Sequence, residues 1–452
     1  MITLGIDYGT TKIAIVSFDT EHPENSRAVS SPHLAGLADL PACHAEQDPG
    51  RVWHTILDLL VQFPDDLRQQ VQTIGLTGQM HSMMLWNRDG QTSPVITWQD
   101  HRASADGLLA GFQRINPTLA DGFGLTTLAW FARQHLLDGW EFAGSPLSWL
   151  ACQLTSTEEP LIDQTFAASW GLWNLDTAAW NRDQLRALDI PERLLPRVVA
   201  PGSLVGKTRH VPGLPDGIPV LAALGDNQAS VLGCAISYRQ NGADGAAPSR
   251  ASEDYSEIYL TLGTGAQLSV VLKPEELADL PSSWQGEIRP FLNGRFLAVN
   301  APLCGGQGWA WLGKAINNIL ETLGVQTFPE HQLLDRLDEL AVKADTNGLM
   351  VDARFLGARD QAGVKASISG IDLANFTLPA LARALAAGLV RQLVTPFPPD
   401  LLHRRSSVIG SGNCVRLCQA IQQEITAQTG IPLTLRQIPE EAATGAAKLA
   451  AR

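Results

Sequence analysis

The sequence predicts an α/β protein that consists of two similar domains. Strands and helices alternate along most of the chain, which is typical of this fold class. Two segments, residues 2–18 and 258–272, have the pattern of a strand, a turn rich in glycine and threonine, and a second strand. A small, polar stretch without periodicity separates them at residues 238–256. The repeated hairpin indicates a related unit on each side of this stretch.

The composition is that of a globular protein with an acidic surface. Of the 452 residues, 45% are hydrophobic and 17% are charged, and the formal net charge is −13. Nucleic acids and anionic membranes require a cationic surface, so we expect neither as a partner. Asp7 interrupts the first apolar stretch, and no apolar run approaches the roughly 18 residues of a membrane helix. We therefore expect a cytoplasmic protein.

The first elements follow from the spacing of the apolar residues. Apolar residues alternate along residues 2–6, residues 8–11 form a turn, and residues 12–18 return as a second strand. Residues 51–63 place their apolar side chains on one face of a helix. Residues 71–77 form a further strand, which ends in a polar turn.

We place the domain boundary in the polar stretch. The sequence predicts an N-terminal domain of residues 1–240, a C-terminal domain of residues 255–452, and a linker or loop of residues 241–254.

The end of the chain has the pattern of a strand, a glycine-rich turn and two helices. Residues 407–409 lead into the turn Gly410-Ser411-Gly412-Asn413. A helix follows over residues 415–429, and Gly430 suits its C-terminal cap. Residues 440–450 form a last helix of small residues, which allows close approach of a backbone or a ligand.

The turn after the first strand combines a carboxylate with two hydroxyl groups. Asp7 ends a buried strand, and Thr10 and Thr11 follow in a turn with exposed N–H groups. Phosphoryl transfer needs a carboxylate that positions Mg²⁺ and donors for the phosphate oxygens. An ordinary hairpin turn with a capping aspartate is the alternative interpretation.

A second turn of this kind lies at Gly263-Thr264-Gly265. Glycine-rich turns are common, so this turn alone is weak evidence. Together the two turns predict a clamp on phosphate groups, with one hairpin from each domain. Residues 308–315 match most of a P-loop, but Ala315 replaces the hydroxyl that would hold Mg²⁺. We expect a helix there that packs its tryptophans.

Asp226 follows the apolar strand of residues 220–224 and is a candidate catalytic base. Open α/β sheets bind ligands at the carboxyl ends of their strands. A sugar hydroxyl has a very high pKa, so its attack on phosphorus benefits from a carboxylate that accepts its proton. An Asx turn or a helix N-cap is the alternative interpretation.

Polar groups and an aromatic ring that suit a polyol follow the strand of residues 71–77. They include the turn Gly78-Gln79-Met80-His81 and, further along the chain, Trp98. A polyol needs paired hydrogen bonds and a flat apolar face. A structural histidine is the alternative interpretation of His81.

In order and spacing these segments resemble the FGGY carbohydrate kinases over essentially the whole chain. The matching segments are Asp7 to Thr11, His44 to Pro49 with Trp53, Gly78 to His81, Trp98 to Arg102, Asp226-Asn227, Gly263 to Gly265, Gly410 to Asn413 and Glu441 to Ala447. Within the family, residues 122–130, 163–171 and 223–230 are most similar to sedoheptulokinases. Two features depart from the family pattern: Ser411 stands between glycines where a glycine pair is usual, and residues 238–256 match no family feature.

The resemblance implies two actin-like ATPase domains, of the ribonuclease H-like fold, with ATP and Mg²⁺ in a cleft between them. It implies that Asp226 is the catalytic base and that Asp7 orients Mg²⁺. The implied sugar-binding residues lie on the N-terminal domain and are Gln79, Met80, His81, Trp98, Asp100, Arg102 and Asn227. The implied phosphate- and ATP-binding residues are Thr10, Thr11, Gly263, Thr264, Gly265, Gly410, Ser411, Gly412 and Asn413.

The implied reaction is the ATP-dependent phosphorylation of a primary hydroxyl of a ketose. Sedoheptulose is the first choice, and xylulose and ribulose are the alternatives. We expect the protein to bind this small-molecule sugar and ATP as a monomer or a homodimer. An actin-like ATPase that acts as a regulator or chaperone would share the phosphate hairpins but would not need His81 or Asp226. A catalytically inactive sugar sensor would not need to keep Asp7 and Asp226 intact.

Overall fold

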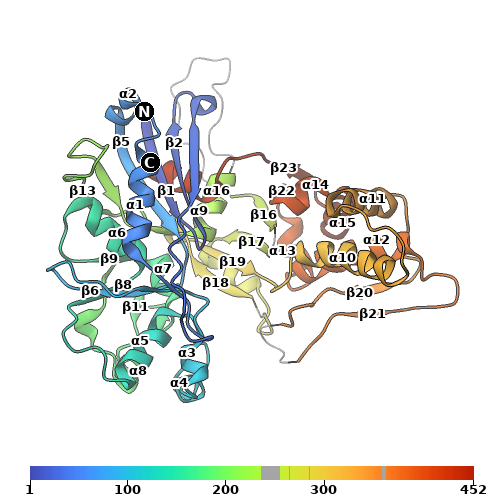
Figure 1. The fold of residues 1–452 in the computed structure, drawn as a ribbon, viewed down its shortest axis with the longest axis horizontal. Coiled ribbons are helices and arrows are strands. Elements are labelled where there is room, and N and C mark those ends of the chain that lie inside the picture. The colour runs from blue at the N-terminus through green and yellow to red at the C-terminus, as the bar shows by residue number, and fades with distance from the viewer. Residues whose placement is uncertain (236–254, 264, 285, 359–362) are drawn as a thin grey trace. The chain divides into compact units, whose positions relative to one another are not determined.

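The computed structural model shows a mixed α/β chain and describes residues 1–235, 255–263, 265–284, 286–358 and 363–452 (Figure 1). The expected linker of residues 241–254 lies outside the described residues. Within the described ranges, no helix has both the length and the apolar character needed to cross a membrane.

The chain divides into two compact units. The first unit consists of Met1–Cys234, Pro290–Leu292 and Ile438–Arg452. The second unit consists of Ala235–Arg289 and Asn293–Gln437. The end of the chain thus belongs to the first unit, which differs from the expected C-terminal domain of residues 255–452.

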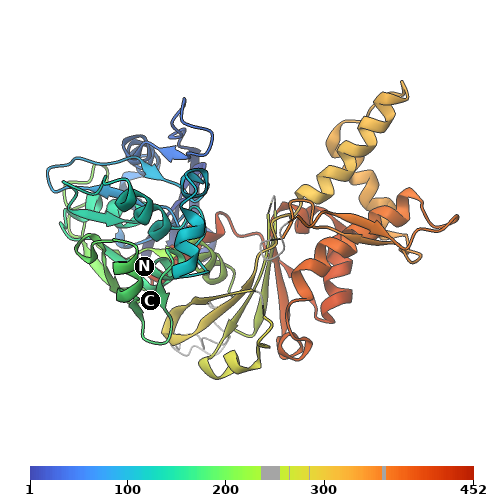
Figure 2. The ribbon, with the colours of Figure 1, turned by 90° about the horizontal axis from the view of Figure 1, so that it is seen from below.

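A sheet with both parallel and antiparallel strands forms the centre of the first unit (Figures 1 and 2). Its strands are β1 (Ile2–Tyr8), β2 (Lys12–Asp19), β3 (Arg27–Pro32), β5 (Val71–Gly78), β13 (Leu204–Lys207), β14 (Pro219–Leu221) and β15 (Leu224–Gly225). The order is β13-β14-β5-β1-β2-β3, and β15 pairs with the end of β5. β1 and β2 form the predicted hairpin, whereas β1 and β15 both run parallel to β5. Their carboxyl ends therefore meet at one edge of the sheet.

Helices and short strand pairs surround this sheet. The helices are α1 (Pro49–Leu60), α2 (Asp65–Gln69), α3 (Arg102–Ala105), α4 (Leu109–Ile115), α5 (Gly124–Arg133), α6 (Pro146–Thr155), α7 (Gln164–Ser169), α8 (Arg182–Ala187), α9 (Asp226–Cys234) and α16 (Glu441–Ala450). The strand pairs are β4 (Glu46–Gln47) with β7 (Val95–Ile96), β6 (Met84–Trp86) with β8 (Phe142–Gly144), β9 (Leu161–Asp163) with β12 (Arg197–Val199), and β10 (Trp173–Asn174) with β11 (Ala179–Trp180).

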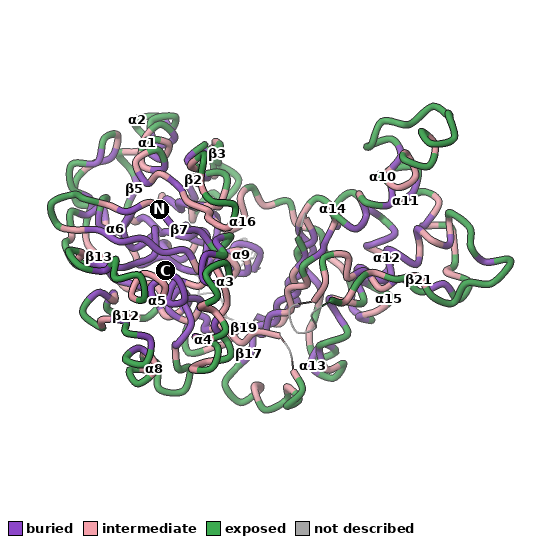
Figure 3. The backbone as a smooth tube through the Cα atoms, turned by 60° about the horizontal axis from the view of Figure 1, so that its bottom comes forward, coloured by how far each residue is buried: buried purple, intermediate pink, exposed green. Residues whose placement is uncertain are grey.

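Two apolar cores cover the two faces of β2. Ile13 and Ile15 point into the main core of the first unit, whereas Ala14, Val16 and Phe18 pack against α16. This division follows from the alternation of side chains along a strand. The central strands are consequently buried on both faces, as the purple trace in Figure 3 shows.

Helix α16 reaches backbone contact with the sheet through glycines. A Cβ atom on Gly5 of β1 would lie 1.9 Å from the carbonyl oxygen of Ala443, and one on Gly75 of β5 would lie 2.0 Å from that of Ala446. In the same way, a Cβ atom on Gly445 would lie 1.8 Å from the carbonyl oxygen of Ala229 in α9. This close packing explains why the last segment of the chain joins the first unit.

The second unit repeats the strand arrangement of the first. Its main sheet contains β16 (Glu257–Leu262), β17 (Ala266–Leu272), β18 (Glu287–Pro290), β19 (Phe296–Asn300), β22 (Ser407–Ser411) and β23 (Leu433–Leu435), in the order β18-β19-β17-β16-β22-β23. β16 and β17 form an antiparallel hairpin and β22 runs parallel to β16, as β1, β2 and β5 do in the first unit. The predicted repeat of the hairpin is thereby confirmed.

Within the described residues, the second unit also contains six α-helices, the short 3-10 helix Pro274–Asp279 and a strand pair. The α-helices and the strand pair are α10 (Gln307–Thr322), α11 (Glu330–Val342), α12 (Leu378–Val394), α13 (Pro399–His403), α14 (Asn413–Leu417), α15 (Gln419–Thr429), and β20 (Met350–Asp352) with β21 (Ser367–Ser369). The segment that resembles a P-loop lies in helix α10, with Trp309 buried, which confirms the expected helix.

The predicted helix of residues 415–429 is interrupted. Cys418 adopts an extended conformation (φ −112°, ψ 104°) between α14 and α15. The Asp338 carboxylate of α11 accepts hydrogen bonds from the backbone N–H groups of Gln419 and Ala420, both at 2.8 Å. A side chain distant in sequence therefore caps α15, and the prediction of one continuous helix was wrong because local periodicity cannot reveal such a cap. Gly430 has φ +69° at the end of α15, as predicted.

The contact between α16 and the sheet gives a first prediction. Gly5→Ala should destabilise the protein by about 1–3 kcal/mol, because the new methyl group meets backbone that cannot be displaced cheaply. We expect Tm, measured by circular dichroism, to fall by roughly 2–12 °C. Gly36→Ala is the control, since a Cβ atom there meets nothing within 4 Å. Equal melting temperatures for the two variants would contradict the packing argument.

Candidate active site

Asp7 lies at the carboxyl end of β1, in a cluster of charged groups. It is paired with Ala14 on β2 and with Thr77 on β5, and it is half-buried. Burial, and after it the nearby carboxylates of Asp226 and Glu440, raise the pKa of the Asp7 carboxyl to about 7, although Lys12 acts to lower it. The ammonium group of Lys12 is paired with Glu440 at 2.7 Å. The cluster thus carries more negative than positive charge.

Asp226 lies at the same edge of the sheet, on the other side of β5. It is the first residue of α9 and directly follows β15. Leu224 of β15 pairs with Thr77, the residue of β5 that also pairs with Asp7. Since neighbouring strands are about 4.8 Å apart, the backbones of β1 and β15 are separated by roughly 10 Å. Asp7 and Asp226 therefore flank the end of β5, and Asp226 begins a helix as the alternative interpretation expected.

The turn between β1 and β2 is held by three side chains. The carbonyl oxygen of Thr10 accepts hydrogen bonds from Nε2 of Gln47 at 2.8 Å and from Nε2 of His33 at 3.0 Å. The indole N–H of Trp98 donates to the Thr10 hydroxyl at 2.9 Å. Thr11 at the tip is exposed. The turn thus has a fixed shape, and the hydroxyl of Thr10 can still donate its own proton.

Gln79 lies in a buried network below this turn. Its Nε2 donates to Oε1 of Gln47 at 2.9 Å, and its Oε1 accepts from the Ser82 hydroxyl at 3.1 Å. Tyr8 donates to the same Gln47 oxygen at 2.6 Å. Only 3% of Gln79 is exposed, so its amide supports the turn from within the core.

His81 is fixed by the C-terminal end of α7. Its backbone has φ +70°, a left-handed conformation that is unusual for residues other than glycine. The ring Nδ1 donates to the carbonyl oxygen of Ser169 at 2.6 Å, and the backbone N–H donates to the Ser169 hydroxyl at 3.3 Å. The ring also stacks on Phe123, with 4.6 Å between ring centroids. These contacts hold the imidazole plane in one orientation.

The neighbours of His81 and Asp226 lie close to the same strand end. Met80 is buried, and a Cβ atom on Gly225 would come within 2.9 Å of its methyl group. The backbone N–H of Asn227 donates to Oδ1 of Asp226 at 2.5 Å. The structure therefore places Met80 beside Gly225, the residue that precedes Asp226 and Asn227.

Of the three residues predicted in the segment after residue 97, only Trp98 is accessible. Trp98 is 46% exposed, beside the Thr10 turn. Asp100 and Arg102 form a buried ion pair at 2.8 Å, and Arg102 also donates to Glu46 at 2.7 Å. The Arg102 guanidinium lies over the ring of Trp130, 5.0 Å from its centroid. Asp100 and Arg102 thus bind each other and the core of the first unit.

In the second unit a set of glycines surrounds the turn after β16. Gly263 and Gly265 form this turn, while Thr264 lies outside the described residues. A Cβ atom on Gly305 would lie 2.2 Å from the carbonyl oxygen of Gly265, and one on Gly412 would lie 2.6 Å from that of Leu262. The segment before α10 and the segment after β22 therefore both reach the backbone of the turn.

The predicted residues Gly410 to Asn413 lie beside this turn because β22 pairs with β16. Gly410 is opposite Leu260, and Ser411 is opposite Thr261, with 2.9 Å between their hydroxyl groups. Ser411 is buried, and Asn413 begins α14. A glycine-lined backbone with N–H groups suits phosphate oxygens.

Several residues of these two sites were not predicted from the sequence. In the first unit they are Gln47, His33, Lys12 and Glu440; in the second they are Gly305 and Gly306. The backbone N–H of Gly306 donates to the carbonyl oxygen of Gly263 at 2.8 Å. The glycine pair at 305–306 was a signal in the sequence; the other four residues act through contacts that spacing does not show.

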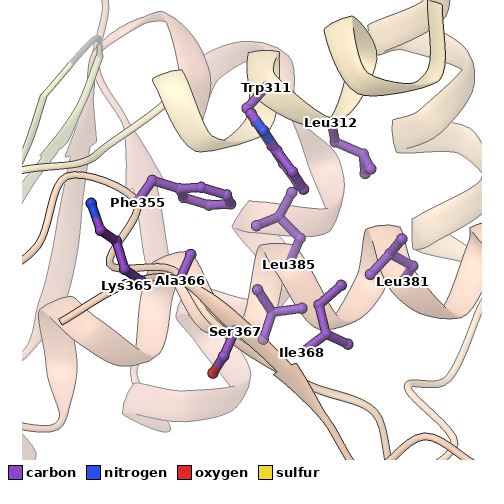
Figure 4. A pocket seen from close by; sticks show the side chains of 10 residues that line it. Trp311, Leu312, Phe355, Lys365, Ala366, Ser367, Ile368, Leu381 and Leu385 are labelled. Carbon is purple, nitrogen blue, oxygen red and sulfur yellow. The ribbon is translucent and has the colours of Figure 1, made fainter. Parts of the chain in front are cut away.

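A separate hollow of about 480 Å³ lies between α10, α12 and the β20–β21 pair (Figure 4). Trp311 and Phe355 lie side by side at its wall, with 4.6 Å between ring centroids. None of the predicted site residues lines it.

The residues around Asp7 fit a magnesium ion whose ligands are mainly water and the phosphate groups of a substrate. Among the described residues, no three His, Cys, Asp or Glu side chains are arranged to hold a metal ion on their own. Mg²⁺ usually keeps several waters and binds through one or two carboxylates together with substrate phosphates. Asp7, with excess negative charge around it, is suited to this kind of binding.

Comparison with known proteins identifies similar chains. Residues 2–233 match the sequence model of the N-terminal domain of the FGGY family of carbohydrate kinases. Human sedoheptulokinase (Homo sapiens) is 28% identical over an alignment of 487 residues, which includes 99% of this chain and 96% of that protein.

Two solved structures share the fold. Xylulose kinase from Rhodospirillum rubrum has a TM-score of 0.81 at 20% identity, with 100% of this chain and 89% of that chain covered. Plasmodium falciparum glycerol kinase with ADP has a TM-score of 0.77 at 19% identity, with 99% and 88% covered. These likenesses confirm the predicted fold class, a mixed α/β protein with two actin-like ATPase domains.

The charge cluster around Asp7 predicts a dependence of stability on pH. The pKa of Asp7 is about 7 in the folded protein and 3.8 ordinarily. The folded state therefore binds the proton more tightly, and the contribution of Asp7 to stability is lost as the pH rises from about 4 to about 7. In EDTA at pH 8, Asp7→Asn should raise the free energy of unfolding by about 1–3 kcal/mol, less than the full shift implies because of solvent screening.

Chemical denaturation at pH 4 and pH 8 measures this difference. The gain of Asp7→Asn over wild type should shrink at pH 4, where the folded protein holds Asp7 protonated. Asp58→Asn, at an exposed position on α1, is the control and should change little at either pH. A destabilised Asp7→Asn protein at pH 8 would contradict the proposed charge balance.

Proposed function

Because the chain belongs to the FGGY family of carbohydrate kinases, we propose that it transfers the γ-phosphoryl group of ATP to a primary hydroxyl of a ketose, with sedoheptulose as the preferred acceptor. The observation that carries the chemistry is the position of Asp7 and Asp226 on either side of the end of β5. The choice of sugar is supported by the likeness to human sedoheptulokinase over 99% of the chain.

Asp226 accepts the proton of the attacking hydroxyl. It is the first residue of α9, and the N-terminus of a helix carries a partial positive charge that attracts negative groups. An ionised carboxylate is the form that a general base requires. The bond from the N–H of Asn227 fixes one of its oxygens and so limits its orientation.

The sugar lies against the side chains that surround the same strand end. His81 and Asn227 offer polar groups, Met80 offers an apolar surface, and the exposed face of Trp98 offers an aromatic plate. Three predicted residues support the proposed sugar site from within the core, where their polar groups form hydrogen bonds or ion pairs. They are Gln79, Asp100 and Arg102.

Each unit offers a glycine- and threonine-containing turn to the phosphate groups of the nucleotide, and the second unit adds the segment after β22. Thr10 and Thr11 in the first unit, and Gly263, Thr264 and Gly265 in the second, donate to phosphate oxygens. Gly410, Ser411, Gly412 and Asn413 form the wall for adenosine. Asp7 would hold Mg²⁺ through a water ligand, and the ion would supply positive charge against the phosphate oxygens. ATP and sugar phosphates are cytoplasmic metabolites, so we place the enzyme in the cytoplasm, as a monomer or a homodimer.

The acceptor is tested by ADP release from ATP·Mg²⁺ with sedoheptulose, xylulose, ribulose and glycerol. We expect kcat/KM for sedoheptulose to exceed that of the other acceptors by at least about 10-fold, since missing substrate contacts reduce transition-state binding. Preference for a pentulose would overturn the proposed acceptor but keep the reaction. ADP release that is independent of every sugar would instead favour an actin-like ATPase of the regulatory class.

The base is tested by Asp226→Asn. This change keeps the size of the side chain but removes the proton acceptor, so we expect kcat to fall by about 10²- to 10⁴-fold. The KM for the sugar should stay within about 3-fold, because the loss is confined to the transition state. Asp58→Asn should behave as wild type. Wild-type kcat in Asp226→Asn would show that another group accepts the proton.

A further inference from the structure

Helix α7 contains no catalytic or binding residue of the proposed function. It nevertheless contacts both the segment before Asp226 and the segment that contains His81. At its start, Oδ1 of Asp163 accepts hydrogen bonds from the N–H of Phe166 at 2.9 Å and from the hydroxyl of Thr165 at 2.7 Å. Asp163 is 1% exposed, and its Oδ2 has no hydrogen-bond partner in the described structure.

The first contact of α7 leads to the catalytic base. The hydroxyl of Thr165 accepts a hydrogen bond from the backbone N–H of Gly225 at 2.8 Å. Gly225 directly precedes Asp226, and a Cβ atom on it would lie 2.5 Å from Oε1 of Gln228. The donation from Thr165 to Asp163 directs the lone pairs of the Thr165 oxygen toward Gly225. The chain from Asp163 through Thr165 thus fixes the backbone immediately before the base.

The second contact of α7 leads to the sugar side. The hydroxyl of Ser169 accepts from the N–H of His81 and donates to the carbonyl oxygen of Phe166 at 2.8 Å. The carbonyl oxygen of Ser169 accepts from Nδ1 of the same histidine. His81 has a left-handed backbone, which persists only where surrounding contacts hold it.

The two contacts have a fixed spacing because they belong to one helix. Thr165 and Ser169 are four residues apart, so they lie on one face of α7 about 6 Å apart along its axis. A rigid helical turn therefore separates the residue that holds the base from the residue that holds His81. Both residues are buried, so solvent does not compete for these bonds.

We propose that α7 is a positioning element that sets the separation between Asp226 and His81, with Thr165 positioning the base and Ser169 positioning the sugar-binding histidine. This inference rests on the proposed function. Neither residue touches the reacting atoms, so each acts through the residue that it holds. A displacement of the base affects the transition state, whereas a displacement of His81 affects binding of the sugar.

Steady-state kinetics with the preferred sugar test the two roles separately. Thr165→Val removes the hydroxyl at nearly constant volume and should lower kcat by about 10- to 100-fold, with little change in the KM for sugar. Thr165→Ser keeps the hydroxyl and should restore kcat to within about 3-fold of wild type. Ser169→Ala should raise the KM for sugar by about 3- to 10-fold, the effect expected for one hydrogen bond, with a smaller change in kcat. The KM for ATP should not change in any variant.

The control is Thr126→Val, because Thr126 is a buried threonine of the same unit whose hydroxyl has no hydrogen-bond partner in the described structure. Wild-type kinetics in both Thr165→Val and Ser169→Ala would overturn the inference, as would equal losses in Thr165→Val and Thr165→Ser. If circular dichroism shows that Thr165→Val does not fold, the same kinetic criteria are applied to Thr165→Ala and Ser169→Ala. A wild-type protein without sugar-dependent activity would refute the proposed function, and this inference with it.

Discussion

The first unit depends on the contact between helix α16 and strands β1 and β5. Glycines at positions 5 and 75 let the helix backbone approach the strands until no side chain fits between them. The Thr3 hydroxyl donates to the carbonyl oxygen of Ala447 at 2.8 Å and adds a buried polar bond to this contact. The helix covers the face of the sheet that the main core does not reach, so β1 and β5 can be buried on both sides. Parallel strands need this burial, and only their parallel course brings Asp7 and Asp226 to one edge.

The same contact shapes the electrostatics of the site. Glu440, directly before α16, lies close enough to Asp7 to raise the pKa of that carboxyl, and its pairing with Lys12 moderates the charge. Three carboxylates near one strand end destabilise the protein without a cation. In the function that we propose, the same carboxylates would suit a substrate that arrives with a divalent ion. The cost in stability therefore lies at the place where the proposed phosphoryl transfer would require charge to be neutralised.

The sequence was sufficient for features that depend on local pattern. The hairpins, the turns at Thr10 and Gly263, and the place of Asp226 after a strand follow from alternation of apolar residues and from glycine. The sequence was insufficient where the local structure depends on a side chain that is distant along the chain. The break at Cys418 depends on Asp338, the burial of Gln79 depends on Gln47, and the Asp100–Arg102 pair is turned inward by Glu46. Docking of α16 on the first unit also depends on glycines far away in the sequence.

The two aspartates that flank β5 have separate roles in the proposed function, and metal binding tests this assignment most directly. The affinity for Mn²⁺, as a substitute for Mg²⁺, can be measured by electron paramagnetic resonance in the presence of ADP for wild type, Asp7→Asn and Asp226→Asn. We expect Asp7→Asn to weaken binding of the ion by about 10-fold or more, as for a carboxylate that orients a metal-bound water. We expect Asp226→Asn to bind the ion as wild type does. Weakened binding in Asp226→Asn with unchanged binding in Asp7→Asn would contradict the assignment of the two roles.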